Sequence, residues 1–284
     1  RIPSIRLSSS LVSWTTDTEN KIGTITLESP ETYNALTVEM GQEFQSLVQT
    51  IQKDLTSGRQ NINAIVLTGA GEKAFSAGGN FDWLMSLKDN SVPDNVDSML
   101  SFYNSFLCIR RLPVPVIAAM QGPAVGAGAG LALACDLRVC SKTSSKLFGF
   151  TFAKLGIHTG MGSSHYLPLA MGGASAVMNE LLFTGNFMTG EQAFRFGLVS
   201  RLVDSTDQVK DEAYRLAREI SAQHPLAVRT MVQTVRQQQD IGLESSLQRE
   251  AYAQAVCYNR ADWGEGVKAV IEQRAPVFSD YHEK

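Results

Sequence analysis

The sequence has few cysteines, and their positions argue against two common uses of this residue. Four occur among 284 residues, at Cys108, Cys135, Cys140 and Cys257. None stands in a C-x-x-C pair or beside a group of histidines, so the pattern favours neither a zinc site nor a disulfide-stabilised scaffold. Cys135 and Cys140 stand among apolar residues, which predicts that they pack in a hydrophobic core. We expect no bound metal.

The sequence also lacks an excess of positive charge and a long hydrophobic run. Lysine and arginine number 25 against 28 acidic residues, which gives a formal net charge of -3. Because nucleic-acid-binding proteins usually carry a broad basic face, we expect no nucleic-acid partner. No stretch approaches the roughly 20 apolar residues that cross a bilayer, so we expect no membrane span. A hydrophobic content of 44% is typical of a globular chain with a full core.

The two ends of the sequence leave the cellular compartment open. The first ten residues, RIPSIRLSSS, are basic, rich in serine and free of acidic residues, which fits the remainder of a transit peptide. The same residues fit vector-derived or ordinary sequence. The final residues, HEK, carry no peroxisomal signal. Mitochondrial and cytoplasmic locations therefore both stay open.

Strands and helices are expected to alternate through the first two thirds of the chain. Hydrophobic patterns predict strands at residues 21–27, 63–69 and 114–122, with two shorter ones within 137–150. Apolar residues at three- and four-residue steps predict helices over 40–55 and 94–111. Later amphipathic stretches predict helices at 208–223, 226–239, 243–256 and 262–274. We predict an α/β core over residues 1–204 and a helical C-terminal region over 205–284, packed on the core or on a neighbouring subunit.

The stretch GPAVGAGAGLALACD, residues 122–136, follows an expected strand and is rich in glycine. A dinucleotide-binding loop needs G-x-G-x-x-G directly after the first strand, whereas this pattern is G-x-G-x-G after a later one. A Walker A loop needs G-K-[ST], and no lysine follows here. A turn of small residues opening a helix can instead aim backbone N–H groups at an oxyanion, such as that forming on a thioester carbonyl. Close packing of a helix on a sheet is the alternative reading.

A second stretch of the same kind strengthens the oxyanion interpretation. AFSAGGNF, residues 74–81, follows the strand expected at 63–69 and again places small residues ahead of a helical segment. One turn rarely completes an oxyanion hole, so two such loops favour a site over packing alone.

Six segments, in the same order along almost the whole chain, resemble the motifs of the crotonase superfamily, also called the enoyl-CoA hydratase/isomerase family. ITLESPETYNALT is similar to the family's strand and N-A-L turn, and KAFSAGGNF to A-F-x-A-G-x-D. PVIAAMQGPAVGAGAGLALACDLRV resembles the strand, N-G-x-x-x-G-G-G-x-E and C-D element, and KLGIHTGMGSSHYLP resembles K-L-G-I-x-P-G-x-G-x-x-x-x-L. LLFTGNFMTGEQAFRFGLVSRLV and GEGVKAVIEQRAPVF resemble later signatures. The resemblance implies a spiral of ββα units with a helical C-terminal trimerisation region.

The resemblance also implies a ligand and an assembly. Members bind acyl-CoA and polarise its thioester with two backbone N–H groups, which here would be those of Ala77 and Ala127. Coenzyme A enters as part of the substrate, with no other cofactor bound, and the chain is expected to form a homotrimer or a dimer of trimers. Thr32 and Tyr33 match positions at the nucleotide end of CoA. The remaining residues expected to contact substrate are Gly78, Gly79, Asn80, Gly126, Gly128, Gly130 and Phe152.

The acidic residues of the family's hydratases are missing. The two glutamates that activate water map onto Gly130 and Phe152, and the aspartate of some dienoyl isomerases and dehalogenases maps onto Gly160. His158, on the loop that lines the acyl pocket in the family, is a candidate base, with a loop-stabilising role as the alternative. Asn80 replaces the common aspartate of A-G-x-D and is expected to cap the following helix.

Two functional hypotheses follow. The first is an enzyme that stabilises a thioester enolate through the backbone oxyanion hole, with hydration ranked below reactions that need only one weak base. The second is a non-catalytic acyl-CoA-binding or scaffold protein that has lost its acid–base residues.

Overall fold

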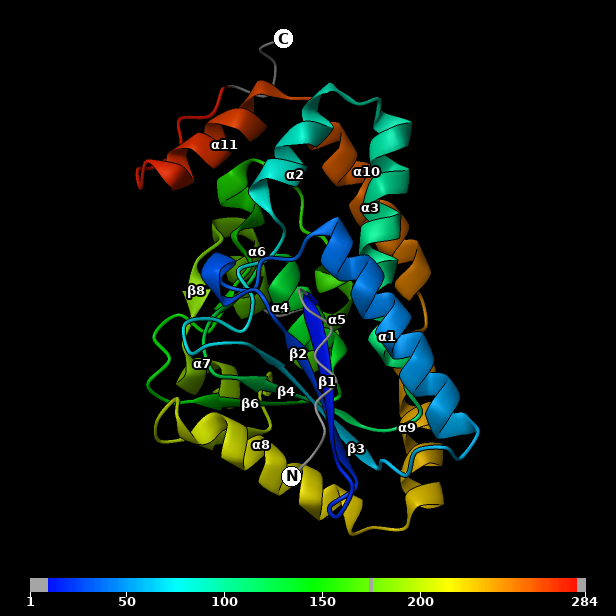
Figure 1. Ribbon diagram of the computed structural model, residues 1–284. Helices are drawn as coiled ribbons and strands as arrows, with labels where there is room; N and C mark the ends of the chain where they lie inside the picture. The colour runs from blue at the N-terminus through cyan, green and yellow to red at the C-terminus, as the bar shows by residue number, and fades with distance from the viewer. Residues whose placement is uncertain (1–9, 174–175, 280–284) are drawn as a thin grey trace.

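The computed structural model describes residues 10–173 and 176–279 (Figure 1). The stretch that fits a transit-peptide remnant lies outside these residues, apart from Ser10. The strands are β1 (Val12–Asp17), β2 (Ile22–Leu27), β3 (Ala64–Gly69), β4 (Val116–Met120), β5 (Ala124–Val125), β6 (Leu137–Ser141), β7 (Phe148–Gly149), β8 (Phe187–Met188) and β9 (Arg201–Val203). The helices are α1 (Val38–Thr56), α2 (Phe81–Ser86), α3 (Val92–Leu107), α4 (Ala127–Ala134), α5 (Ser163–Ala170), α6 (Ala176–Thr184), α7 (Gly190–Arg195), α8 (Gln208–Ser221), α9 (Pro225–Gln239), α10 (Leu243–Tyr258) and α11 (Ala261–Ile271). Short 3-10 turns lie at Pro30–Thr32, Leu87–Asp89, Cys108–Arg111 and Thr151–Leu155.

A six-stranded sheet in the order β1-β2-β3-β4-β6-β9 forms the centre of the fold. β1 pairs antiparallel with β2, and the remaining neighbours are parallel. A second sheet, β5-β7-β8, stands apart and carries the start of the glycine-rich stretch. Parallel strands need crossover connections, which the intervening helices supply. The chain therefore has the α/β architecture expected from its alternating pattern.

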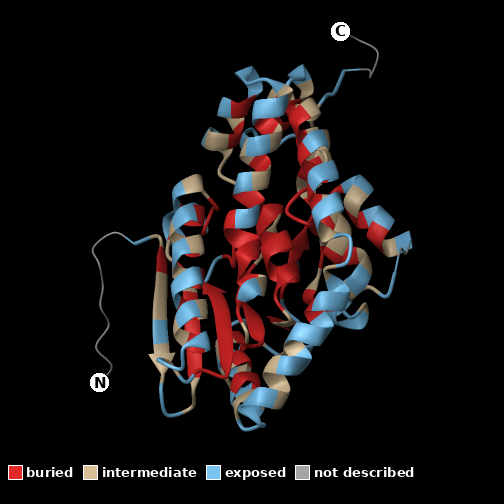
Figure 2. Ribbon diagram, turned by 90° about the vertical axis from the view of Figure 1, so that its right-hand side faces the viewer, coloured by how far each residue is buried: buried red, intermediate tan, exposed pale blue. Residues whose placement is uncertain are grey.

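Both faces of the large sheet are covered, as its strand sequences require. In β3, Ile65 and Leu67 face the main core, whereas Ala64 and Val66 face the other side, because side chains alternate along a strand. Helix α8 covers this second side and runs beneath the strands in Figure 1. Figure 2 shows the strands buried in red between helices whose outer faces are pale blue.

The main core lies between the sheet and the helices that follow the early strands. Helices α1 and α3 contact each other, and α3 packs closely along α10. The C-terminal helices therefore pack on the α/β core within the same chain, one of the two arrangements expected for them.

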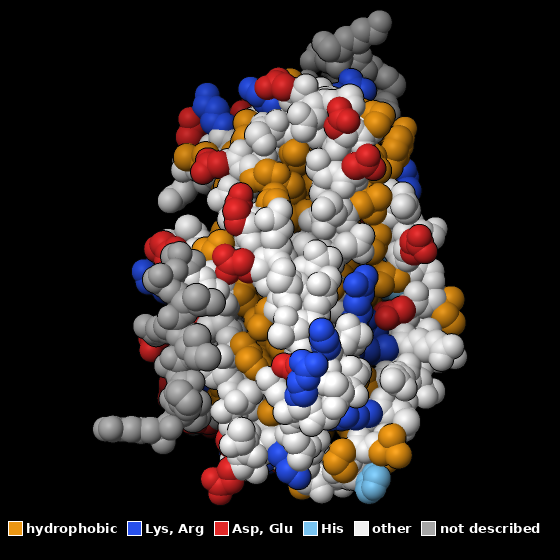
Figure 3. Space-filling model, turned by 45° about the vertical axis from the view of Figure 1, so that its right-hand side comes forward, with side chains coloured by type: hydrophobic (Ala, Val, Ile, Leu, Met, Phe, Trp, Pro, Cys, Tyr) orange, Lys and Arg blue, Asp and Glu red, His pale blue; other side chains and the backbone are white. Residues whose placement is uncertain are grey.

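On the face shown in Figure 3, acidic and basic side chains are interspersed among small groups of apolar ones. Among the described residues, no helix combines the length and the apolar character that crossing a membrane requires.

Most predicted elements are confirmed. The described elements without a predicted range include β1 and β9 of the large sheet and, within residues 163–195, α5, α6, β8 and α7. β1 has the sequence VSWTTD, in which polar residues outnumber apolar ones. The structure shows why such a sequence forms a strand: it pairs along the edge of the sheet in register with β2, from Val12 opposite Leu27 to Asp17 opposite Ile22. The helix expected over 94–111 ends at Leu107 and continues as a 3-10 turn.

Candidate functional site

The two glycine-containing loops lie side by side. Ser76 and Ala124 form a parallel β-bridge, and the Val125 N–H donates to the Ser76 carbonyl at 2.9 Å. A Cβ atom added at Gly78 would lie 3.4 Å from the backbone nitrogen of Ala127. Residues 74–80 and 123–128, far apart in the sequence, therefore meet at the N-terminus of α4.

Glycine is required at the closest point of this meeting. Gly78 has a φ of +95°, and a side chain there would lie 2.5 Å from the carbonyl oxygen of Val125. Gly126, which precedes α4, has a φ of +52° and a ψ of -119°, a conformation that side chains rarely allow. Because α4 begins directly after this turn and has no side-chain cap, its first N–H groups have no partner within the helix.

The backbone N–H groups of the first loop differ in their hydrogen bonding. The Ala77 N–H donates to the Tyr33 carbonyl at 2.9 Å, so the donor expected from the sequence is already paired. The Leu36 N–H donates to Gly78 O at 2.7 Å, and Asn80 N–H donates to Leu36 O at 2.9 Å. This bridge leaves the Gly79 N–H facing away from Leu36, and it has no partner among the described residues.

The Ala127 N–H is also unpaired within the described chain. Ala127 is the first residue of α4, so no earlier turn of the helix supplies a carbonyl to accept its N–H. The first hydrogen bond at this end is from Gly130 N–H to Gly126 O, at 3.2 Å. Gly79 and Ala127 thus each present a free N–H where the two loops meet.

A largely apolar cavity of about 60 Å³ lies against both loops. Helices α2, α3 and α10 and the segment 151–161 form its other walls. Among the described residues that line it, none is charged and none is a histidine. The lining residues are Ala77, Gly78, Gly79, Phe81, Leu84, Met99, Phe102, Tyr103, Val125, Gly126, Ala127, Thr151, Phe152, Leu155, Ile157, Gly160, Met161, Gln254 and Tyr258.

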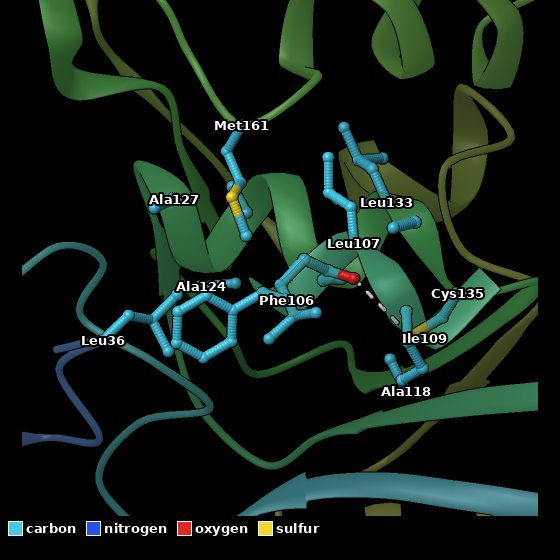
Figure 4. Close-up of a cluster of buried hydrophobic side chains, with 14 of the residues drawn as sticks. Leu36, Phe106, Leu107, Ile109, Ala118, Ala124, Ala127, Leu133, Cys135 and Met161 are labelled. Carbon is cyan, nitrogen blue, oxygen red and sulfur yellow. Dashed lines mark hydrogen bonds between the residues drawn. The ribbon is translucent and has the colours of Figure 1, made fainter. Parts of the chain in front are cut away.

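Apolar side chains lie at or against positions 130 and 152, where the family's hydratases carry glutamates. Phe152 lines the cavity, and its ring lies 3.8 Å from the position of a Cβ atom on Gly126. A Cβ atom on Gly130 would lie 2.5 Å from the carbonyl oxygen of Met161 and 2.8 Å from its Cβ. Figure 4 shows the Met161 side chain pointing from its loop toward α4, where Ala127 lies. Position 130 therefore has no room for a side chain in this structure.

Of the twelve residues expected from the sequence to take part in catalysis or substrate contact, six line the cavity and six do not. Ala77, Gly78, Gly79, Gly126, Ala127 and Phe152 line it. Gly128 lies behind it, where a side chain would meet the Ser76 carbonyl at 2.6 Å, so its role is close packing of α4 on the first loop. The others outside the lining are Thr32, Tyr33, Asn80, Gly130 and His158.

The residues outside the lining have structural partners. Asn80 Oδ1 accepts from the Trp83 N–H at 2.9 Å, which confirms the expected helix cap. Thr32 donates its hydroxyl to Ser29 O within its own turn, and the Tyr33 side chain is 49% exposed, with Lys73 Nζ 5.7 Å from its ring centroid. His158 is half-buried, and its Nδ1 lies 2.7 Å from Thr159 O. That contact fits the loop-stabilising alternative, and it leaves Nε2 as the nitrogen able to accept a proton.

Three polar side chains that the sequence reasoning missed form one wall of the cavity. Tyr103 donates to Gln254 Oε1 at 2.6 Å, and Tyr258 lies 3.2 Å from the same atom. Gln254 Nε2 donates to His158 O at 2.8 Å. Burial raises the pKa of both tyrosines above the usual range, so their hydroxyls stay protonated. In the sequence, this wall is indicated only by Gln254, a polar residue that helical spacing places on the buried face of α10.

A buried carboxylate holds the loop that carries Met161. Glu250, on α10, is 0% exposed, and its two oxygens accept from the N–H groups of Gly162 and Ser164 at 2.7 and 2.8 Å. Burial raises the pKa of Glu250, against the effect of these hydrogen bonds. Because both oxygens are occupied and Glu250 is not a lining residue, it positions the loop and does not face a ligand.

The buried cysteines and the ion pair between Asp136 and Arg236 are structural in this fold. Cys108, Cys135 and Cys140 are buried, and burial raises the pKa of each thiol to about 12. Asp136 pairs with Arg236 and accepts from the Val116 N–H at 2.7 Å. No cluster of three metal-ligating side chains occurs within residues 10–173 and 176–279.

Comparison with known proteins gives one consistent family. Residues 17–281 match the family model described as enoyl-CoA hydratase/isomerase. The chain is 34% identical over 256 residues to a putative enoyl-CoA hydratase/isomerase, YngF, of Bacillus subtilis, covering 89% of this chain and 93% of the relative. It is 32% identical to the 1,2-epoxyphenylacetyl-CoA isomerase of Escherichia coli, covering 92% and 96% respectively.

Solved structures show the same fold. A crystal structure of an enoyl-CoA hydratase from Mycobacterium avium subsp. paratuberculosis superposes with a TM-score of 0.81 at 23% identity, covering 96% of this chain and all of that one. An enoyl-CoA hydratase/isomerase from Pseudoalteromonas atlantica gives a TM-score of 0.78 at 26% identity, covering 95% and 100%. The crotonase-type fold expected from the sequence motifs is confirmed.

Proposed function

We propose that this protein, which belongs to the enoyl-CoA hydratase/isomerase family, binds acyl-CoA thioesters and stabilises a thioester enolate with two backbone N–H groups. The observation that carries the proposal is the meeting of two free N–H groups beside an apolar cavity. Coenzyme A enters as part of the substrate, as the family implies, and the thioester oxygen would lie between the two loops.

The proposed donors are Gly79 and Ala127. The Ala77 N–H, first considered from the sequence, is excluded from the pair by its hydrogen bond to Tyr33 O at 2.9 Å. Gly79 is two positions further along the same loop and lines the same cavity. Donors held by a folded backbone need no reorganisation when charge develops, and each is typically worth about 3 kcal/mol of barrier.

The cavity favours chemistry that does not use a carboxylate to activate water. Its described lining contains no acidic side chain, and Phe152 and Met161 occupy the region where the family's hydratases carry theirs. We therefore rank isomerisation, decarboxylation or another reaction through an enolate above hydration. His158 is retained as a candidate base only through Nε2, since Nδ1 is engaged with Thr159 O.

The decisive experiment removes one donor without breaking its helix. Proline is well tolerated at the first position of a helix, so Ala127→Pro deletes the N–H of Ala127 while α4 can still form. We expect turnover of a panel of unsaturated and malonyl-type acyl-CoA thioesters to fall about 100-fold. Val38→Pro, at the first position of α1 and outside the cavity, is the matched control and should retain activity. Equal activity of the two variants would rule out Ala127 as a donor.

The second candidate is an acyl-CoA-binding protein without catalysis. Position 130 has no room for a side chain, and position 152 carries phenylalanine. Neither position supplies a carboxylate near the thioester, which favours this second candidate. Binding of the panel by isothermal titration calorimetry with no turnover of any member would select this alternative. Turnover that depends on Ala127 would select the enzyme.

We also propose that the chain assembles as a homotrimer or a dimer of trimers, as the family resemblance implies. Exposed apolar side chains on α9 support a subunit contact there. Leu226, Met231 and Val235 are between 51% and 65% exposed in the single chain.

A further inference from the structure

We infer that the cavity selects acyl groups that carry a neutral hydroxyl, which would bind to the wall formed by Tyr103, Gln254 and Tyr258. The inference rests on the proposed function, since it assumes that the cavity receives the acyl group of a CoA thioester. It adds the chemical class of that acyl group.

The wall is a set of buried polar groups in apolar surroundings. Tyr103, Gln254 and Tyr258 are 1%, 2% and 1% exposed, and all three line the cavity. A Cβ atom on Gly160 would lie 2.5 Å from Tyr103 Oη and 2.7 Å from Gln254 Nε2, so only a glycine at position 160 leaves these atoms uncovered. Each of these three side chains already has a partner in the described chain, so a ligand can gain only from the hydrogen-bonding capacity that these partners leave unused.

The hydrogen-bond directions determine what the wall can still accept. The amide of Gln254 is oriented by its donation to His158 O and by the tyrosine hydroxyls at its Oε1. The Tyr103 proton is directed to Oε1 at 2.6 Å and its oxygen is hydrogen-bonded by the Met161 backbone. The Tyr258 oxygen accepts from no described donor and so retains acceptor capacity. Gln254 Nε2 has a second N–H beyond the one given to His158 O. The wall therefore offers an acceptor and a donor together.

Tyr258 is the adaptable member of the wall. Its hydroxyl lies 3.2 Å from Gln254 Oε1 and 3.6 Å from Met99 Sδ, so its proton has two weaker acceptors. Redirecting that proton to a ligand oxygen costs little, whereas redirecting the Tyr103 proton breaks a 2.6 Å bond.

This combination distinguishes three kinds of acyl group. A hydroxyl both accepts and donates, and so matches the wall. A hydrocarbon leaves the polar atoms facing an apolar group. A carboxylate would be buried without a counter-charge, because no described lining residue is lysine, arginine or histidine. The cavity of about 60 Å³ exceeds the roughly 10–15 Å³ that holds a single water, so it has room for a short acyl chain.

The test compares isosteric acyl-CoA pairs by isothermal titration calorimetry on the whole protein. The first pair is 4-hydroxybutyryl-CoA and pentanoyl-CoA, and the second is 3-hydroxybutyryl-CoA and 3-methylbutyryl-CoA, each exchanging a hydroxyl for a methyl group. We expect the hydroxyl member of at least one pair to bind about 10-fold more tightly, and succinyl-CoA to bind more weakly than both. Equal affinities within both pairs would overturn the inference.

Two variants test whether the polar wall causes the preference for acyl groups with a hydroxyl. Tyr258→Phe should reduce the hydroxyl preference about 10-fold while leaving the affinity for the methyl member unchanged or improved. The matched control is Tyr166→Phe, since Tyr166 is also buried but contacts Asp240 and does not line the cavity. An unchanged preference in Tyr258→Phe, or an equal loss in Tyr166→Phe, would contradict the assignment.

The same data separate the two proposals. Binding of the methyl members without a hydroxyl preference would reject the inference and leave the proposed acyl-CoA function standing. Failure to bind any of these CoA thioesters would reject both.

Discussion

Gly130 is a single residue at which the surrounding atoms decide what the chain can carry. The sequence alone indicates that a hydratase glutamate is absent there, and the structure adds that the carbonyl of Met161 would lie 2.5 Å from any Cβ atom at this position. A change of residue 130 therefore requires the loop carrying Met161 to move. That loop is in turn held by the buried Glu250.

Two glycine-to-alanine variants in helices should have opposite effects on stability. Gly130→Ala places a methyl group against backbone and should lower the free energy of unfolding by about 1–3 kcal/mol. Gly264→Ala, in α11 with nothing within 4 Å of the added atom, should raise it by up to about 1 kcal/mol through helix propensity. Urea unfolding followed by circular dichroism measures both. A neutral Gly130→Ala would mean that Met161 moves freely.

Single residues also mark how far the sequence predicts the site. The glycines of both loops could be recognised because their spacing is characteristic. The pairing of Ala77 N–H with Tyr33 O could not, since it depends on how residues 33–36 lie against residues 77–80. Tyr103 and Gln254 are 151 residues apart, and only the packing of α3 on α10 brings them together.

Among the elements, α10 does more than cover the core. Its buried face carries Glu250 and Gln254 at i and i+4, so one helix orients both the loop of Met161 and the polar wall. The existence of this helix could be predicted from its apolar pattern. The purpose of its buried polar residues could not, because their partners lie on other elements.

The raised pKa of Glu250 predicts a pH dependence of stability. Its folded-state pKa lies above the ordinary 4.5, chiefly because of burial. The contribution of Glu250 to the free energy of unfolding is therefore fully present below about pH 4.5 and is lost as the pH rises through the folded-state pKa. We expect the stability of the wild type, relative to Glu250→Gln, to fall as the pH rises from 4.5 to 7.5. Urea unfolding at several pH values measures it, with Glu244→Gln, exposed on the same helix, as control. A difference that grows with pH would show that the hydrogen bonds outweigh burial.

At the scale of the whole molecule, α9 is the least buried of the long helices. Arg236 is its single buried residue, and it donates to the carbonyls of Arg110 and Leu112 at 2.8 and 2.6 Å. The apolar residues of α9 therefore contribute little to the core of their own chain. A surface of this kind is typical of a contact between subunits.

Light scattering coupled to size-exclusion chromatography tests the proposed assembly. We expect a trimer or hexamer for the wild type and dissociation by the double substitution Met231→Glu and Val235→Glu, which places two charges on one side of α9. The control is Gln233→Glu with Gln237→Glu, which adds the same charge on another side of the helix and should leave the mass unchanged. A monomeric wild type would refute the assembly.

The short ladder between residues 33–36 and 77–80 has a consequence for chain length. Its hydrogen bonds, from Ala77 to Tyr33 and between Leu36 and the Gly78–Asn80 segment, fix the offset between two segments more than forty positions apart. Deleting or inserting one residue between Tyr33 and Leu36 would shift that offset and exchange which N–H groups of the loop are paired. Homologous chains with the same site should therefore vary in length outside this segment, and engineered insertions should be placed elsewhere.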